Sequence, residues 1–222
     1  MELIIKLILC YLLGSVSGSM LMGKLKGIDI RKMGSGNAGA TNAFRTMGSS
    51  FALRVLIIDI LKGFIAVEFV PSLTLGGILT TNIILTTNIM NIELLPHVLC
   101  GISVVMGHIF PLYFGFKGGK GVGSIMGVLI ALFPTSLFIC LPIWLVVLIF
   151  SGYVGLSTMI VGIAFPICTL IFYTKGIYSP FGFFSLMVPV LFIYTHRLNI
   201  SRMIAGKENR FERIMVFRRN NN

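Results

Sequence analysis

Acidic residues are scarce in this chain, which has only seven Asp and Glu among 222 residues, and charged residues of both signs make up 11%. A soluble domain normally has about 25% charged residues. Hydrophobic residues reach 56%, and the mean hydropathy is +0.96. This composition excludes an ordinary soluble protein and predicts a polytopic membrane protein.

Cysteine is also sparse and shows no functional spacing. Cys10, Cys100, Cys140 and Cys168 occur singly inside apolar runs. Metal sites and disulfide frameworks need cysteines at defined spacings, so we interpret these four as packing residues. We expect no metal and no cofactor.

The shortage of His and Asp excludes several classes of lipid enzyme. Acyltransferases that use coenzyme A or a carrier protein have a His-x4-Asp motif. Here the residues five positions after the three histidines, His97, His108 and His196, are Ile102, Tyr113 and Ser201. A phosphatidyl transferase needs several acidic metal ligands, and Asp29, Asp59 and Glu68 are too few and too far apart in the sequence.

Apolar runs recur along the whole chain, and a membrane-spanning helix needs about 20 such residues. The runs are 3–23, 52–70, 94–114, 119–133, 135–150, 154–173 and 178–195. The first run has no signal-peptide flanks, and Gly14 and Gly18 predict close helix contact on one of its faces. Pro134 predicts either a turn between two short helices or a kink in one long helix.

Basic residues cluster at three places, which decides the expected orientation. The clusters are Lys24, Lys26, Arg31, Lys32, Arg45 and Arg54; then Lys117 and Lys120; then Arg197, Arg202, Lys207, Arg210, Arg213, Arg218 and Arg219. The positive-inside rule is met by seven transmembrane helices with the N-terminus outside and the C-terminus cytoplasmic. We therefore expect an all-α integral membrane protein with one polytopic domain over 1–222. In this topology 71–93 is an external loop or insertion, and 196–222 is a basic cytoplasmic tail.

The segment 33–45 differs in composition from the apolar chain around it. It is rich in Gly, Asn, Ser and Thr and ends at Arg45. Glycine allows backbone N–H groups to form a concave anion site, and a guanidinium fits phosphate oxygens. We interpret this segment as a binding site, and the alternative is a flexible loop rich in turn residues.

A second glycine-rich segment, 115–124, contains Lys117 and Lys120 and follows His108. It lacks the spacing of a nucleotide-binding P-loop. Glycine N–H groups, two ammonium groups and a helix start still favour an anion cradle over a basic turn that only fixes topology.

Two further groups of polar residues lie within or beside apolar runs. His196, Arg197 and Asn199 follow the last run, where they form either a third part of the site or an anchor to anionic lipid. Asp59 and Lys62 lie inside the second run, where charges are costly unless paired, so they indicate either function or a buried structural pair.

Three motifs together resemble a known family. The first is Tyr11–Ser15 followed by Gly34–Asn37, Gly39–Asn42 and Arg45; the second runs from Gly107-His108 to Gly121; the third is His196–Ile200 with Gly206–Asn209. The chain resembles the bacterial acyl-phosphate:glycerol-3-phosphate acyltransferases of the PlsY type over nearly its whole length. One departure is Gly155, because the family commonly has serine at this position; Ser157 and Thr158 follow it here.

The resemblance implies acyl transfer from acyl phosphate to the sn-1 hydroxyl of glycerol 3-phosphate, which yields lysophosphatidic acid. The expected catalytic residues are Ser35, Lys117, Lys120, His196 and Asn199. The expected substrate-binding residues are Gly34, Gly36, Asn37, Thr41, Asn42, Arg45, His108, Gly118, Gly119, Gly121, Arg197 and Glu208. The proton acceptor stays open between His108, His196 and a substrate phosphate.

The expected partners are the two substrates and membrane lipids, with no nucleic acid, and a monomer is compatible with the sequence. We expect the protein in the bacterial plasma membrane with its active site facing the cytoplasm. The alternative function is a small transporter for a phosphate-bearing anion, but the inverted repeats typical of transporters are not evident.

Overall fold

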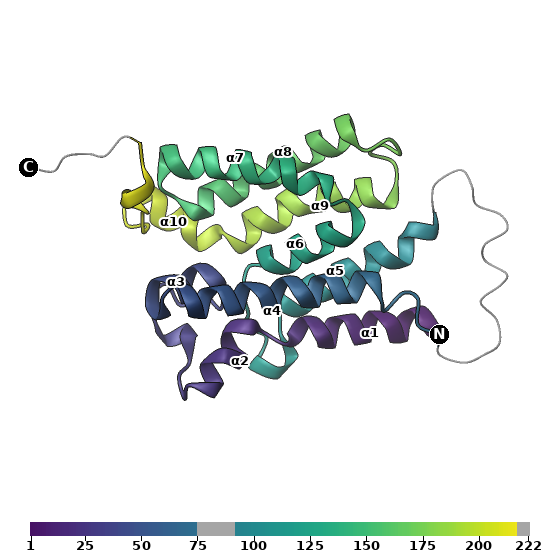
Figure 1. The fold of residues 1–222 in the computed structure, drawn as a ribbon, viewed down its shortest axis with the longest axis horizontal. Helices are drawn as coiled ribbons and strands as arrows, with labels where there is room; N and C mark the ends of the chain where they lie inside the picture. The colour runs from purple at the N-terminus through teal and green to yellow at the C-terminus, as the bar shows by residue number, and fades with distance from the viewer. Residues whose placement is uncertain (75–91, 217–222) are drawn as a thin grey trace, which may run out of the picture. The chain divides into compact units, whose positions relative to one another are not determined.

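A computed structural model describes residues 1–74 and 92–216, and every regular element within these ranges is helical, which confirms the expected all-α class (Figure 1). The α-helices are α1 (Glu2–Ser15), α2 (Gly18–Leu25), α3 (Ala40–Met47), α4 (Ser49–Glu68), α5 (Leu95–Ile109), α6 (Val122–Leu132), α7 (Thr135–Ser151), α8 (Val154–Phe172), α9 (Pro180–Thr195) and α10 (Arg197–Ile204). Short 3-10 helices are η1 (Ile30–Lys32), η2 (Ile92–Leu94), η3 (Leu112–Phe114) and η4 (Glu212–Ile214). The predicted external segment 71–93 falls mostly outside the described residues.

The chain divides into two compact units. Unit 1 is Met1–Pro134 together with Ser179–Phe181, and unit 2 is Thr135–Tyr178 together with Gly182 and the residues after it. The expected single domain over 1–222 stays a prediction. Pro134 separates α6 from α7, which resolves the ambiguity in the sequence: the chain forms two helices there.

Each of the seven apolar runs contains a helix, but length and composition support fewer spans. In the described residues, Leu95–Phe114 and Val154–Phe172 are long and apolar enough to cross a membrane. The count rises to four if the bent pairs α1 with α2 and α9 with α10 each form one span. The topology of seven spans and the orientation of the termini stay predictions.

The first apolar run is not one continuous helix, contrary to the simplest interpretation of residues 3–23. The backbone is extended at Val16 and Ser17, and α2 departs from α1 at 47°. No proline explains the break. A pair of buried charges on α4 binds the backbone at the break, as described below with the candidate site.

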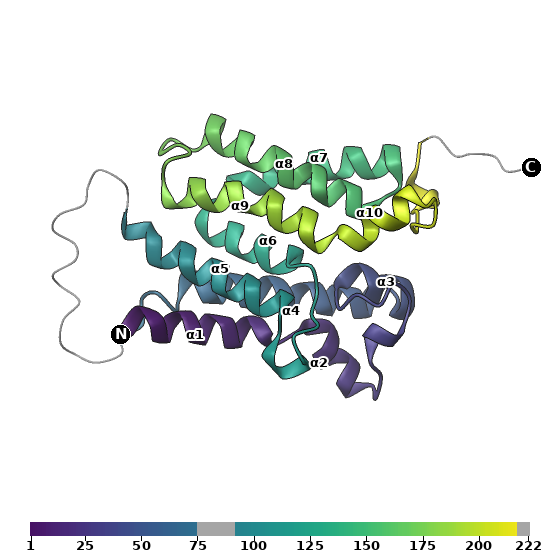
Figure 2. The ribbon, with the colours of Figure 1, turned by 180° about the vertical axis from the view of Figure 1, so that it is seen from behind.

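Glycines allow the helices of unit 1 to pack closely. A side chain added at Gly14 of α1 would overlap the backbone of Val104 in α5, and one at Gly127 of α6 would overlap Ile60 of α4. Small residues at such contacts let two backbones approach each other. Figures 1 and 2 show α1, α4 and α5 running alongside one another, while α2 and α3 lie away from the N-terminus.

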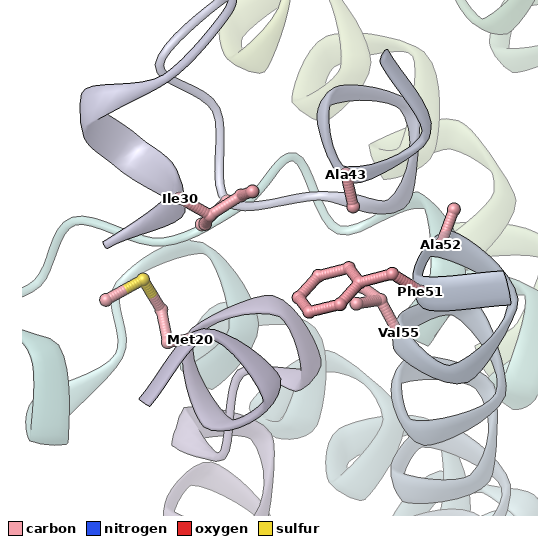
Figure 3. Packing of buried hydrophobic residues seen from close by; sticks show 7 residues of the cluster. Met20, Ile30, Ala43, Phe51, Ala52 and Val55 are labelled. Carbon is pink, nitrogen blue, oxygen red and sulfur yellow. The ribbon is translucent and has the colours of Figure 1, made fainter. Parts of the chain in front are cut away.

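A buried apolar cluster holds the first loop, residues 26–48 between α2 and α4, against α4 (Figure 3). Met20 of α2, Ile30 of η1 and Ala43 of α3 pack around Phe51, which points from the start of α4. Burying a side chain such as Phe51 stabilises a fold by about 2 kcal/mol. This cluster gives the polar loop between α2 and α4 a rigid support.

Unit 2 contains α7, α8, α10 and most of α9, and its C-terminal segment folds back onto the α7–α8 junction. The Phe211 N–H donates to the Gly152 carbonyl oxygen at 2.9 Å, and the Arg210 Nε donates to the Ser151 carbonyl oxygen at 3.3 Å. The described part of the predicted basic tail is therefore packed on its own unit.

Candidate active site

The amide of Asn42 braces the first loop from within. Its Oδ1 accepts the Ser35 N–H at 2.8 Å, and its Nδ2 donates to the carbonyl oxygens of Ile30 at 3.1 Å and Met33 at 3.0 Å. Asn42 is 1% exposed. The sequence predicts substrate binding at Asn42, and the role that these contacts support is to shape the loop that presents Ser35.

Glycines at the tip of the first loop adopt conformations that other residues avoid. Gly34 and Gly36 have φ of +57° and +74°. A Cβ on Gly34 would also lie within 2.8 Å of the Thr46 methyl group. The partly exposed residues Asn37, Thr41 and Arg45 lie at this loop and the following helix α3. The predicted site residues of the segment 33–45 therefore share one local structure.

The second loop, residues 110–121 between α5 and α6, packs tightly on the end of α5. The N–H groups of Gly118 and Gly119 donate to the carbonyl oxygens of Ile109 at 3.2 Å and His108 at 3.1 Å. These two N–H groups are therefore engaged within the protein, whereas the sequence interpretation used them for an anion. The first turn of α6 offers N–H groups without partners inside its own helix, and Gly121 at φ +86° precedes it.

The two loops meet inside unit 1. A Cβ on Gly119 would collide with Nε2 of His108 and lie 2.8 Å from the carbonyl oxygen of Ala38 in the first loop. Lys117 is exposed and Lys120 partly exposed on the second loop. The sequence predicted that these segments converge, and for the first two the structure confirms it.

Asp59 and Lys62 of α4 stabilise the break between α1 and α2. Lys62 Nζ donates to the carbonyl oxygens of Gly14 at 2.9 Å and Val16 at 2.8 Å, and it lies 3.1 Å from Asp59 Oδ1. The same carboxylate oxygen accepts the Gly18 N–H at 3.2 Å. The pair thus satisfies backbone groups that a broken helix leaves open, which favours the structural alternative for these charges.

His108 lies beside this buried pair, and its ring lies next to Gly119 of the second loop. Its Nδ1 lies 3.4 Å from Asp59 Oδ1, without the alignment of a hydrogen bond, and the residue is 3% exposed. The sequence predicts substrate binding by His108, but the imidazole is enclosed beneath Gly119. The contacts support a positioning role.

Arg31 is a polar residue of the site that the sequence interpretation counted only as a topology signal. Its Nε and Nη2 donate to the two carboxylate oxygens of Asp29, each at 3.0 Å. The bonded guanidinium holds the pKa of the Asp29 carboxyl below its usual value, and Asp29 raises the pKa of Arg31. Its Nη1 reaches the second loop, where it donates to the Phe114 carbonyl oxygen at 2.9 Å.

The third motif forms a side-chain network in unit 2. Asn199 Nδ2 donates to Glu208 Oε1 at 2.9 Å, and Arg202 Nε donates to Glu208 Oε2 at 2.6 Å. Arg197 is exposed, and its guanidinium lies 4.5 Å from the centre of the Tyr194 ring. Glu208, predicted to bind substrate, here fixes the amide of Asn199.

His196 is buried with a defined tautomer. Its Nδ1 lies 2.8 Å from the Phe192 carbonyl oxygen. A carbonyl only accepts hydrogen bonds, so Nδ1 carries the hydrogen and Nε2 of the neutral ring keeps a lone pair.

Gly155 occupies space directly beside Asn199. A Cβ at this position would lie 3.2 Å from Asn199 Nδ2. The hydroxyls of Ser157 and Thr158 donate to the carbonyl oxygens of Tyr153 and Val154, each at 2.9 Å. These nearby hydroxyls are therefore bonded to their own helix. The convergence of this third cluster with the loops of unit 1 stays a prediction.

Comparisons with known proteins agree on one family. A family model described as glycerol-3-phosphate acyltransferase matches residues 4–206. The glycerol-3-phosphate acyltransferase of Chlorobium phaeobacteroides is 37% identical, over 96% of this chain and 97% of the relative, and that of Chlorobaculum tepidum is 39% identical, over 92% and 94%.

Solved structures give the same result. The crystal structure of PlsY (YgiH), an integral membrane glycerol 3-phosphate acyltransferase, in its glycerol 3-phosphate form is similar with a TM-score of 0.78 and 31% identity. The match covers 95% of this chain and 96% of that one. The lysophosphatidic acid form of the same protein matches with a TM-score of 0.76.

Proposed function

Because the chain belongs to the glycerol-3-phosphate acyltransferase family, we propose that it transfers a fatty acyl group from acyl phosphate to the sn-1 hydroxyl of glycerol 3-phosphate. The chain is a membrane-bound acyltransferase. The proposed products are lysophosphatidic acid and inorganic phosphate. The observation that carries the proposal is the contact between two glycine-rich basic loops, because this reaction brings two phosphate-bearing substrates together.

Acyl phosphate is the donor that best matches the polar residues present. The chain lacks the His-x4-Asp motif of acyltransferases that use coenzyme A or a carrier protein. Phosphate is already a good leaving group, so no covalent enzyme intermediate is needed. Lys117, Lys120 and the N–H groups at the start of α6 would stabilise the charge on the carbonyl oxygen and the departing phosphate.

The proposed step is a direct displacement. The glycerol hydroxyl oxygen forms a bond to the acyl carbon, and the bond between that carbon and the phosphate oxygen breaks. Arg45, Arg197 and Asn199 would hold the phosphate of glycerol 3-phosphate beside the donor, with the rate gain that proximity gives. The hydroxyl proton would pass to His108, to His196 or to the phosphate of a substrate.

The proposed topology has seven spans, with the N-terminus outside and the loops and C-terminus on the cytoplasmic side of the bacterial plasma membrane. The distribution of Lys and Arg supports it through the positive-inside rule. Single cysteines placed at Lys32 and Lys207 of a cysteine-free variant should both react with a membrane-impermeant thiol reagent only in inside-out vesicles. Labelling of either site from the outside would refute this orientation.

The decisive assay uses the purified protein with acyl phosphate and glycerol 3-phosphate, followed by mass-spectrometric identification of the product. We expect lysophosphatidic acid and phosphate in equal amounts. Acyl-coenzyme A supplied in parallel identifies the donor, since product from acyl-coenzyme A alone would overturn the acyl phosphate assignment. Anion uptake into proteoliposomes without chemical conversion would favour the transporter.

A further inference from the structure

The guanidinium of Arg31 joins the first loop to the second through backbone atoms. Its Nη1 donates to the carbonyl oxygen of Phe114 at 2.9 Å and to that of Lys117 at 3.4 Å. These acceptors lie 83 and 86 residues further along the chain. The remaining nitrogens are held by both oxygens of Asp29, and Asp29 also accepts the Arg31 N–H at 3.0 Å.

The turn between those two carbonyls has an unusual backbone. Gly115 has φ +65°, and Phe116 has φ +59° as the one non-glycine residue with a positive φ among the described residues. A bulky residue in this region is strained and persists only where its surroundings hold it in place. The Phe116 N–H donates to the Pro111 carbonyl oxygen at 2.9 Å, and Arg31 fixes the carbonyls on both sides of the strained residue.

We propose that Arg31 is a positioning residue that clamps the strained Gly115–Phe116 turn and thereby orients Lys117 and the start of α6 toward the acyl donor. This role rests on the function proposed above. Because Asp29 already engages the charge of Arg31 on two sides, the guanidinium acts on the loop and does not bind substrate phosphate. The planar fork of arginine is needed, since a lysine ammonium cannot reach a carboxylate and two carbonyls in these directions.

The test compares Arg31→Gln and Arg31→Lys with Lys32→Gln, which removes an exposed neighbouring cation. The first measurement is amide hydrogen exchange of the 110–121 segment in the purified protein, because the N–H groups of Gly118 and Gly119 are hydrogen-bonded there. We expect exchange at these amides to accelerate about tenfold or more in both Arg31 variants and to stay unchanged in Lys32→Gln.

The second measurement is the steady-state kinetics of acyl transfer, with kcat and the KM for each substrate determined separately. Arg31→Gln and Arg31→Lys should each lower kcat/KM about tenfold, with the KM for glycerol 3-phosphate nearly unchanged. Adding Phe116→Gly to Arg31→Gln should recover part of the loss, because glycine adopts a positive φ without strain. A general destabilisation would not be relieved by a second substitution that adds flexibility.

Three outcomes would overturn the proposal. Exchange that stays at the wild-type rate in Arg31→Gln would show that no clamp exists. Faster exchange with unaltered kinetics would remove the positioning role, and an equal loss in Lys32→Gln would reduce the effect to general charge. Failure of the proposed function is distinguishable, because the wild-type protein would then form no product while the exchange contrast persisted.

Discussion

The two loops of unit 1 and the third cluster of unit 2 hold their polar side chains by different means. In unit 1, Asn42, Lys62 and Arg31 all bind backbone carbonyl oxygens. In unit 2, Asn199 and Arg202 bind the side chain of Glu208. A carbonyl is present whatever residue supplies it, so these three carbonyl contacts depend on the donor side chain alone, whereas the two contacts with Glu208 depend on both side chains.

The largest effect should follow the loss of Lys62. Lys62→Met leaves the buried Asp59 carboxylate without its counter-ion and uncaps the α1–α2 break, at a cost of about 3–5 kcal/mol. The Lys62→Met/Asp59→Asn double variant should be more stable than the single variant, since no buried charge remains unpaired. Thermal unfolding in detergent measures both, and a Lys62→Met protein as stable as wild type would contradict the assignment.

The second largest effect on stability should follow the loss of the Asn42 amide, which braces the first loop through three hydrogen bonds. Asn42→Ala leaves the Ser35 N–H and two carbonyls without their partner, and we expect a loss of about 2–3 kcal/mol at about 1 kcal/mol per bond. Thr41→Ala in the same turn is the control and should change the unfolding temperature little. If the two variants unfold at one temperature, Asn42 does not brace the loop.

In unit 2, the side chains of the Glu208 network should show energetic coupling. Glu208→Gln and Arg202→Gln should each cost about 1–2 kcal/mol, because each weakens the bond of 2.6 Å between them. The double variant should cost less than the two losses added together, as expected for residues in direct contact. A double-mutant cycle of unfolding free energies measures this coupling, and strict additivity would argue against the network.

A smaller effect, on turnover and not on stability, should come from Gly155. In Gly155→Ala the new methyl group presses on Asn199, which must move by a few tenths of an ångström. We expect kcat to fall by roughly tenfold or less. Ser157→Ala should leave turnover unchanged, because that hydroxyl bonds its own helix. Equal kcat values for Gly155→Ala and wild type would show that Asn199 tolerates displacement.

The smallest effect concerns the Asp29–Arg31 pair, which is partly exposed and worth about 0.5–1 kcal/mol. The pKa of Asp29 is lowered by folding from the ordinary value of 3.8. The pair therefore stabilises the protein in full above about pH 4 and loses this effect as the pH falls through the lowered pKa. The difference in unfolding temperature between wild type and Asp29→Asn should be constant from pH 5 to 7 and vanish in stronger acid.

Composition and spacing were enough to predict the all-α membrane class, the helices at the apolar runs, and the position of the three polar clusters. They did not give the contacts of the individual residues within the clusters. Substrate binding by Asn42 and His108 stays a prediction, and their contacts within the protein brace the first loop and adjoin the second. The contacts of Arg31 could not be predicted, because its acceptors are the carbonyl oxygens of Phe114 and Lys117, and a backbone acceptor has no sequence signature.

The sequence by itself determined the class and the family of this protein, because apolar content, cation placement and glycine-rich motifs are local properties of the chain. Only the tertiary structure shows where the first helix breaks and how the break is stabilised, with Lys62 and Asp59 of α4 bound to the open backbone of Gly14, Val16 and Gly18. It also decided that the two loops of unit 1 are joined through Arg31. Both features rest on side chains that bind distant backbone groups, and a backbone group is the same at every position.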